Sequence, residues 1–379
     1  MQSRKTFKYR LYSSKNDKHL HQMIDASGDI WNHCIALHRR YYRMFGKHLH
    51  KYRLQKHIAK LRNKSSYWKL VDAQSVQVIT ERIDNSYMAF FKWCKNKKGI
   101  KKRPPRFKKK KNFKSFTLKQ NGWKYPDIHR NRVRICKKWY KFCFNRFIQG
   151  DIRTVTIKRD NLGKLWICFS VKMEIVEPSD VAVDFSESNV CGLDFGLKTF
   201  ITTNHGDFIE SPEYLKQSLS ELKRLSKKFS KKKRGSKNWH KAKNELNRLY
   251  IKISNQRRDW LFKLANNLLS KYDLICIEDL DLESMKKRWG RKISDVSYSE
   301  FVIILKYLAK DQGKHVITID RYYPSSQMCS SCGKIKEDLK LSDRTYNCSC
   351  GLSLDRDENA AKNILRQGIV SCGADVRPA

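Results

Sequence analysis

Two hydrophobic periodicities divide the first half of the chain. Apolar and basic residues alternate from Lys5 to Tyr12, which predicts a strand. Between about Lys15 and Lys98 apolar residues recur at helical spacing, which predicts a small all-helical segment. From Phe116 to Lys172 the period returns to two, and Asn/Gly turns separate the apolar runs. We therefore expect a compact β-barrel or sandwich that is interrupted by helices.

The pattern of the second half predicts an α/β domain. Three short apolar runs predict buried strands: Val190–Asp194, Leu274–Ile277 and His315–Ile319. Long segments with leucines at helical spacing lie between the first two strands, and a good helix-forming run extends from about Glu358 to Gln367. The sequence Glu-Pro-Ser-Asp at 177–180 marks the boundary between the two halves.

The charge of the chain indicates its partners. There are 81 Lys and Arg residues against 37 Asp and Glu, a formal net charge of +44. Such an excess favours a polyanion, either nucleic acid or an anionic membrane. The membrane is the weaker alternative, because no apolar run approaches the roughly 18 residues of a spanning helix. The first residues also lack the apolar core of a secretory signal, so we expect an intracellular protein.

Four of the 12 cysteines have the spacing of a metal knuckle. Cys329 and Cys332 form a C-x-x-C pair followed by glycine, and Cys348 and Cys350 form a C-x-C pair, also followed by glycine. Two such pairs predict a structural Zn²⁺ with four thiolate ligands. The alternative is a reduced cysteine-rich turn without metal, since the C-x-C pair closes a tighter chelate ring. The seven histidines between His19 and His57 lack ligand spacing, and we expect them to be solvated or packed.

Three acids are placed where strands and helices end. Asp194 and Glu278 follow the first two predicted strands, and Asp357 lies at the start of the last helix. Adjacent strands would bring the first two carboxylates side by side. Such a group repels itself unless hard cations neutralise it, which predicts two Mg²⁺ ions and phosphodiester cleavage. Alternatively each acid only ends a strand or caps a helix, and Asp355 competes with Asp357 for the third place.

The densest basic tract runs from Lys95 to Phe116. We predict that it contacts the phosphate backbone of nucleic acid, and that Phe107, Phe113 and Phe116 stack on bases or anchor the loop. The alternative is a solvated linker. The candidate nucleic-acid-binding residues are Lys101, Lys102, Arg103, Arg106, Lys108, Lys109, Lys110 and Lys111.

Four segments carry a family resemblance: GLDFGLKTF, ICIEDL, DRYYPSSQMCSSCG and CGLSLDRDENAAKNIL. In this order they resemble the TnpB family of transposon-encoded proteins, which are relatives of the compact type V CRISPR effector nucleases. The likeness is strong over about residues 190–366 and extends to 1–175 only in layout and basicity. It implies an N-terminal β-barrel with a helical insert, followed along the chain by a RuvC-like nuclease domain of RNase H type with an inserted zinc knuckle. The family's D-x-N-A-A pattern makes Asp357 the third acid.

The resemblance also implies a function and a domain layout. We expect a monomeric RNA-guided DNA endonuclease of a prokaryotic cytoplasm or nucleoid. It would hold a structured guide RNA, recognise a short motif in double-stranded target DNA and cleave next to it. A transposase or integrase of the same fold and a catalytically inactive RNA-guided repressor are the alternatives. The expected domains are a wedge-like β-barrel (1–14 and 104–178), a helical recognition insert (15–103), the RuvC-like nuclease (186–325 and 353–368), a zinc knuckle (326–352) and a tail (369–379).

Overall fold

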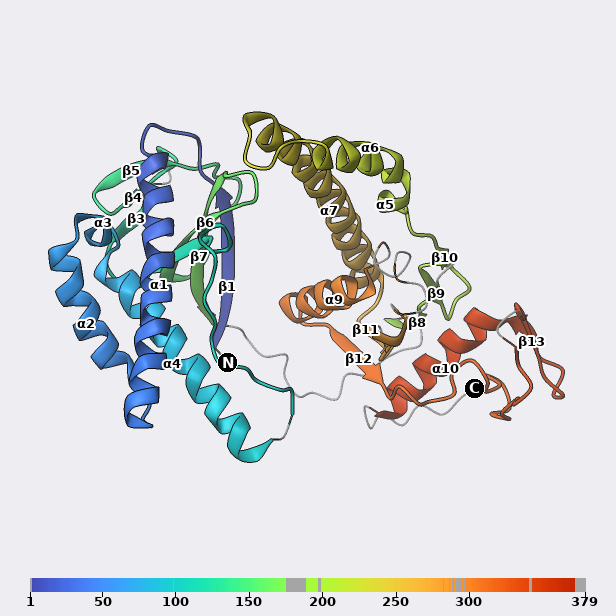
Figure 1. Ribbon diagram of the computed structural model, residues 1–379. Coiled ribbons are helices and arrows are strands. Elements are labelled where there is room, and N and C mark those ends of the chain that lie inside the picture. The colour runs from blue at the N-terminus through green and yellow to red at the C-terminus, as the bar shows by residue number, and fades with distance from the viewer. Residues whose placement is uncertain are drawn as a thin grey trace. The chain divides into compact units, whose positions relative to one another are not determined.

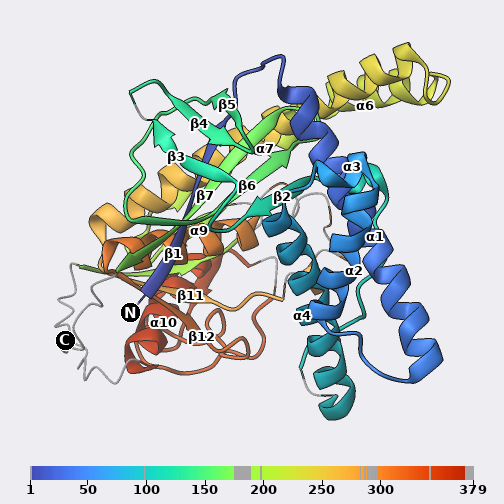
Figure 2. The ribbon, with the colours of Figure 1, turned by 90° about the vertical axis from the view of Figure 1, so that its left-hand side faces the viewer.

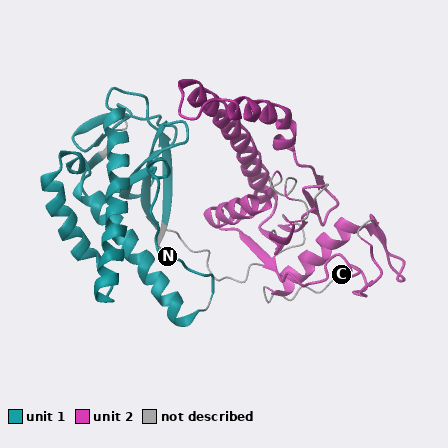
Figure 3. Ribbon diagram, in the orientation of Figure 1, with its two compact units in different colours: residues 1–176 teal, residues 177–379 magenta. Residues whose placement is uncertain are grey.

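The structure is a computed structural model of the whole chain. It describes residues 2–174 apart from 98 and 128, and residues 189–371 apart from 197–198, 282, 286, 288–289, 291–294, 296 and 341–342. The chain divides into two compact units, residues 1–176 and 177–379 (Figure 3). The expected boundary at 177–180 and most of the expected tail lie outside the described residues. In the described part of the chain, no helix is both long and apolar enough to span a membrane.

Helices make up one side of the first unit, as the periodicity between Lys15 and Lys98 predicts. They are α1 (Asp17–Phe45), α2 (Lys51–Lys64), α3 (Ser66–Lys69) and α4 (Ala73–Asn96). Gly46 ends α1 in the left-handed conformation with φ 62°, and its N–H donates to the Tyr42 carbonyl at 2.8 Å. Asp72 begins α4, because its carboxylate accepts the Gln74 N–H at 2.8 Å. Local capping therefore sets the limits of the two longest helices here.

Two antiparallel sheets complete the first unit. The larger has the strand order β1-β7-β6-β2 and is formed by β1 (Gln2–Arg10), β7 (Leu165–Glu174), β6 (Asp151–Arg159) and β2 (Ser115–Leu118). The smaller has the order β3-β4-β5, with β3 (Trp123–Asp127), β4 (Arg132–Ile135) and β5 (Lys138–Lys141). The helices gather beyond the β2 end of the larger sheet (Figures 1 and 2). A mixed α/β fold is thus confirmed, whereas closure into a barrel stays a prediction.

A five-stranded sheet forms the centre of the second unit, in the order β10-β9-β8-β11-β12. Its strands are β8 (Val190–Asp194), β9 (Ile201–Thr203), β10 (Phe208–Ile209), β11 (Leu274–Glu278) and β12 (His315–Ile319). The first three form an antiparallel meander, and β11 pairs parallel with β8 and β12. The helices of this unit include α5 (Tyr214–Gln217), α6 (Leu219–Ser230), α7 (Lys237–Lys271), α9 (Tyr298–Gln312) and α10 (Arg356–Ser371).

Alternation along the central strands sends their side chains to two separate cores. Cys191 and Leu193 of β8 pack in the cluster that holds α7 and α9, together with the corresponding isoleucines of β11. Val190 packs with Leu274 and Cys276 in the cluster that holds α10. Because the side-chain period of a strand is two, Asp194 and Glu278 belong to the second set and share the α10 face of the sheet.

Two glycines let α10 approach the sheet closely. A Cβ at Gly192 of β8 would lie 2.1 Å from the Ala361 carbonyl oxygen, and a Cβ at Gly368 of α10 would lie 2.2 Å from the Cys276 sulfur. Real Cβ atoms essentially never come so near, so only glycine fits at either position. The two contacts fix α10 against β8 and β11 at van der Waals distance, and α10 carries Asp357 in its first turn.

Candidate active site and cysteine cluster

The pairing of β8 with β11 brings two of the expected acids together. In the parallel register Leu274 pairs with Val190 and Ile277 pairs with Leu193. One step further along, the same register aligns Glu278 with Asp194, at the usual strand separation of roughly 4.8 Å. Both residues are the last of their strands. The two carboxylates therefore lie side by side on one face at one edge of the sheet, as the apolar patterns predict.

Asp357 comes to the same place from α10. Three causes raise the pKa of Asp194 to about 8. Burial is the largest, the charge of the nearby Asp357 carboxylate is the second, and the charge of Glu278 is the third. The Arg356 guanidinium opposes this rise, and its Nη2 lies 3.3 Å from Asp357 Oδ1. Burial, followed by the charge of Asp279, also raises the pKa of Glu278. The group is therefore short of positive charge, which is the condition of a divalent-cation site.

Asp355 has a different task from Asp357. Its Oδ1 accepts the backbone N–H of Asp357 at 2.9 Å and that of Glu358 at 3.2 Å. A carboxylate so placed satisfies the free donors at the start of α10 and complements the positive end of the helix. Asp355 is thus held as the helix cap, whereas the Asp357 side chain is directed toward the neighbouring acid on β8.

Two buried asparagines connect α10 to the loop with the first cysteine pair. The Nδ2 atoms of Asn359 and Asn363 donate to the Met328 carbonyl at 2.7 Å and 2.6 Å, and that of Asn363 also donates to the Ser325 carbonyl at 2.9 Å. Asn359 Oδ1 accepts the Ser330 N–H at 2.9 Å. Sequence reasoning assigned these asparagines no contact. Their spacing of four residues beside buried alanines, on one face of a helix, is the signal that could have revealed it.

The four knuckle cysteines converge as their spacing predicts. Their sulfur atoms all lie within 4.8 Å of one another, with 3.7 Å between those of Cys329 and Cys350 and 3.6 Å between those of Cys332 and Cys348. A tetrahedral site with Zn–S bonds of about 2.3 Å requires sulfurs about 3.8 Å apart. The arrangement fits Zn²⁺, and the C-x-C pair does not disturb it. A Cys350 backbone N–H lowers the pKa of Cys348 to about 6, which favours the thiolate that a metal needs.

The carboxylates are less tightly gathered than the sulfurs. Among the described residues, only the cysteine group brings three or more ligand atoms within 4.8 Å of one another. The oxygen-only donor set of Asp194, Glu278 and Asp357 fits Mg²⁺ or a similar hard cation.

The basic tract is ordered along α1. Asn32 exchanges two hydrogen bonds with the backbone of Lys108, at 2.8 Å and 2.9 Å, and Trp31 Nε1 donates to the Arg106 carbonyl at 3.1 Å. Phe113 and Phe116 are buried in the core of the first unit, so they anchor the tract and cannot stack on bases. Phe107 remains 52% exposed. The alternative of a solvated linker is therefore wrong for the second half of the tract, residues 106–116.

The candidate cations of the tract differ in their surroundings. Lys108 Nζ lies 4.1 Å from the centre of the Trp31 ring, and burial lowers the pKa of this lysine. Lys110 reaches the Tyr67 hydroxyl and lies 4.0 Å from Asp29. The other candidates are exposed and form no ion pair with the residues that the structure describes. They are Lys101, Lys102, Arg103, Arg106, Lys109 and Lys111.

Two family models match the second part of the chain. One, described as a probable transposase, matches residues 170–288, and the other, described as a Cas12f1-like TNB domain, matches residues 298–364. The first covers the strands that end in Asp194 and Glu278. The second covers the cysteine cluster and the first half of α10.

Curated relatives match over part or all of the chain. A putative RNA-guided DNA endonuclease of Streptomyces pristinaespiralis is 32% identical over 229 residues, which are 59% of this chain and 56% of that protein. Another, InsQ of Escherichia coli, is 25% identical over 403 residues, covering 100% of this chain and 96% of that protein. A TnpB-like protein of Acanthamoeba polyphaga mimivirus is 31% identical over 57% of this chain and 44% of its own length. The chain thus spans about half the length of two of these relatives.

The fold matches a solved structure as well. The Cas12f1 chain of a cryo-EM complex with single-guide RNA and target DNA superposes with a TM-score of 0.58 over 96% of this chain and 98% of that one. The sequence identity is 14%, so the likeness concerns the fold. It extends over both units, including the first 175 residues, where the sequence resemblance is weak.

Proposed function

This chain belongs to the TnpB family, and we propose that it is an RNA-guided DNA endonuclease that cleaves phosphodiester bonds at Asp194, Glu278 and Asp357. The observation that carries the proposal is the meeting of these three carboxylates on one face of the central sheet. The relatives named as RNA-guided DNA endonucleases support the same activity.

The three acids would hold the divalent metal. Two bound Mg²⁺ ions would supply the activated water and the charge stabilisation that phosphodiester hydrolysis needs. Helix α10 holds Asp357 in place. The Asp355 carboxylate, which accepts the N–H groups of Asp357 and Glu358, fixes the direction in which the helix starts. Arg356 pairs with Asp357 and would help to offset the charge of the acids before the metal binds.

The partners and the finer domain layout belong to the same proposal. We assign residues 186–325 and 353–368 to a RuvC-like nuclease domain of RNase H type and 326–352 to its zinc knuckle. Residues 1–14 and 104–178 would form a β-barrel, and 15–103 its helical insert. This first part would bind guide RNA and double-stranded target DNA through exposed cations such as Lys109 and Lys111. The net charge of +44 supports binding of nucleic acid. The structural neighbour, which was solved with guide RNA and target DNA, supports these two partners.

A cleavage assay with matched acid variants tests the proposal. Asp194→Asn, Glu278→Gln and Asp357→Asn should each abolish cleavage of a target that matches the bound RNA, while affinity for RNA and DNA stays within about twofold. Asp279→Asn is the matched control, because it also removes a carboxylate next to Glu278 but from an exposed side chain paired with Arg321 at 2.7 Å. Full cleavage by Glu278→Gln would refute the assigned triad.

The same assay separates a transposase from an endonuclease, which matters because one matching family model is described as a probable transposase. An endonuclease leaves cut ends in solution. A transposase or integrase would join DNA ends to the target, giving products longer than the substrate on a denaturing gel. Binding without cleavage by the unaltered chain would instead indicate an RNA-guided repressor.

A further inference from the structure

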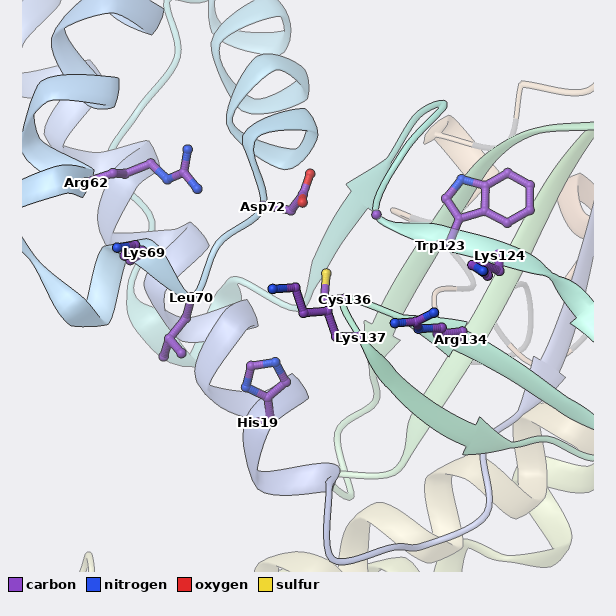
Figure 4. Close-up of a pocket in the computed structure, with 11 residues that line it drawn as sticks. His19, Arg62, Lys69, Leu70, Asp72, Trp123, Lys124, Arg134, Cys136 and Lys137 are labelled. Carbon is purple, nitrogen blue, oxygen red and sulfur yellow. The ribbon is translucent and has the colours of Figure 1, made fainter.

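The first unit contains a hollow of about 520 Å³ in which the helices face the small sheet (Figure 4). Its volume is that of a small-ligand site. The α1–α4 side contributes His19, Arg62, Lys69, Leu70 and Asp72. The β3–β5 side contributes Gly122, Trp123, Lys124, Arg134, Cys136 and Lys137. The hollow belongs wholly to this unit and contains none of the three candidate catalytic acids and none of the four knuckle cysteines.

Five of the lining side chains are cationic, and the structure gives them no acidic partner. Arg62, Lys69, Lys124, Arg134 and Lys137 form no ion pair with any described residue. The Nε of Arg62 is buried and lacks a hydrogen-bond partner. Buried donors without partners are costly, so this guanidinium indicates an absent acceptor. The acceptor that suits several cations around one hollow is a phosphate group.

The hairpin between β4 and β5 is strained where it meets the hollow. Its two turn residues, Cys136 and Lys137, have φ values of 44° and 72°, in the left-handed region where Asn-Gly is usual. The Cys136 N–H donates to the Gly122 carbonyl at 2.8 Å, which ties the turn to the start of β3. Side chains kept in such a conformation are typical of functional sites. Here the turn presents the exposed Lys137 ammonium at the hollow.

An aromatic side chain and a single acid complete the lining. Trp123 is partly buried, and its Nε1 donates to the Lys119 carbonyl at 2.6 Å, which fixes the ring. Asp72 accepts the Gln74 N–H, and no other donor among the described residues reaches its carboxylate. A carboxylate has about four acceptor positions, so Asp72 keeps capacity for a hydroxyl donor. Burial, followed by Lys138, lowers the pKa of His19, so this imidazole is neutral at pH 7.

We propose that this hollow binds one unpaired nucleotide of an RNA strand, with its phosphate among the five cations and its base against Trp123. Fixed aromatic rings beside cationic grooves are the usual platform for single strands. Double-stranded nucleic acid is too wide for a hollow of this volume. The ribose 2′-hydroxyl, which distinguishes RNA from DNA, would donate to Asp72. The inference deepens the proposed function by naming a contact for its RNA, but it is tested by binding alone, so a loss of cleavage leaves it standing.

The test uses the full chain, freed of bound RNA in high salt, and fluorescence anisotropy with two labelled ten-nucleotide probes. One probe is unstructured RNA and the other is DNA of the same sequence. Trp123→Leu should weaken RNA binding about 5- to 150-fold, which corresponds to loss of one stacked base. Trp139→Leu is the matched control, because Trp139 lies on β5, two strands from β3 in the same sheet, is 41% exposed and does not line the hollow.

A second pair of variants tests the phosphate without touching the core. Lys137→Gln should lower the slope of log affinity against log salt by about 0.7, the value for one phosphate contact of a single strand. Lys60→Gln, on the same helix as Arg62 but outside the lining, should leave the slope unchanged. Asp72→Asn keeps the cap of α4 and should reduce the preference for RNA over DNA.

Three outcomes decide the matter. Weaker binding by Trp123→Leu and Lys137→Gln but not by their controls supports the proposal, and retention of binding by Trp123→Phe supports stacking. If Trp123→Leu unfolds, Lys137→Gln decides alone. Binding by both variants at the level of their controls overturns the proposal. Equal affinity of the unaltered chain for the RNA and DNA probes overturns the assignment to RNA.

Discussion

Substitution of Gly192 by alanine tests how closely α10 must approach the sheet. The new Cβ would lie 2.1 Å from the Ala361 carbonyl oxygen and 2.8 Å from Leu365 Cβ. Ordinary contacts begin at about 3.4 Å, so α10 must retreat by about 3.4 − 2.1 = 1.3 Å, because a backbone carbonyl cannot swing away. That displacement would carry Asp357 away from Asp194 by a similar amount.

Two magnitudes follow from this displacement. Overpacking a well-packed core costs about 1–3 kcal/mol, and a backbone obstacle places this case at the upper end, at about 3 kcal/mol. A misplacement of about 1 Å at reacting groups costs on the order of 10²-fold in rate. We therefore expect Gly192→Ala to unfold at lower denaturant concentration and to cleave about 100-fold more slowly. Affinity for RNA should not change, because the cations proposed to bind it lie in the other unit.

The assay compares Gly192→Ala with Gly290→Ala. Gly290 lies in the same unit, but a Cβ there meets no atom of the described residues within 4 Å and the φ angle is not positive. Denaturant unfolding and single-turnover cleavage should separate the two variants by the amounts given. Cleavage by Gly192→Ala at the rate of the Gly290→Ala control would refute the argument that helix–strand contact positions Asp357.

Four further predictions concern other parts of the chain. Asn363→Leu should destabilise the second unit by about 2–3 kcal/mol in denaturant unfolding, because it leaves the Ser325 carbonyl without its donor. Metal analysis should find about one zinc per chain, lost in Cys329→Ser but kept in Cys94→Ser, whose thiol is exposed and outside the cluster. Burial, and second to it the charge of His48, lowers the pKa of His38 from an ordinary 6.5 to about 4. Neutral His38 therefore stabilises the fold fully above pH 6.5, and this contribution of up to about 3 kcal/mol is lost as the pH falls toward 4. His38→Phe should flatten that part of the plot of unfolding free energy against pH. Lys109→Ser and Lys111→Ser should each lower the salt slope of DNA binding by about 0.7–0.9, whereas Lys108→Ser should mainly destabilise the first unit, because Lys108 packs on Trp31.

The strand-end positions of Asp194 and Glu278 could be predicted from the sequence, because they follow from strand periodicity. A short apolar run that ends in an acid predicts where a strand stops. The expected strand Val190–Asp194 matches the observed one residue for residue, and the expected strand Leu274–Ile277 ends one residue before the observed Leu274–Glu278. The parallel pairing of the two strands, however, depends on the helices between them. The sequence also did not decide whether Asp355 or Asp357 is the third acid. That choice depends on which N–H groups each carboxylate reaches.

Tertiary contacts explain what the sequence did not predict. The basic tract resembles a linker in composition, yet Phe113 inserts against Gly28, where a Cβ would lie 3.0 Å from Phe113 Cβ. Histidine spacing gave no indication that His48 bridges His38 and Asp84, at 2.8 Å and 2.7 Å, because these residues come from three different segments. Such contacts join residues that are distant in sequence and leave no local period.

Exchange of the RNA that the protein carries shows directly whether this RNA selects the DNA that is cut. The chain is purified with its RNA, the RNA is sequenced, and the segment that matches a cleaved DNA is replaced by an unrelated one. If the bound RNA guides cleavage at Asp194, the cut moves to the DNA that matches the new segment, and Asp194→Asn cuts neither DNA. A cut that stays at the original DNA, whatever RNA is bound, would contradict it.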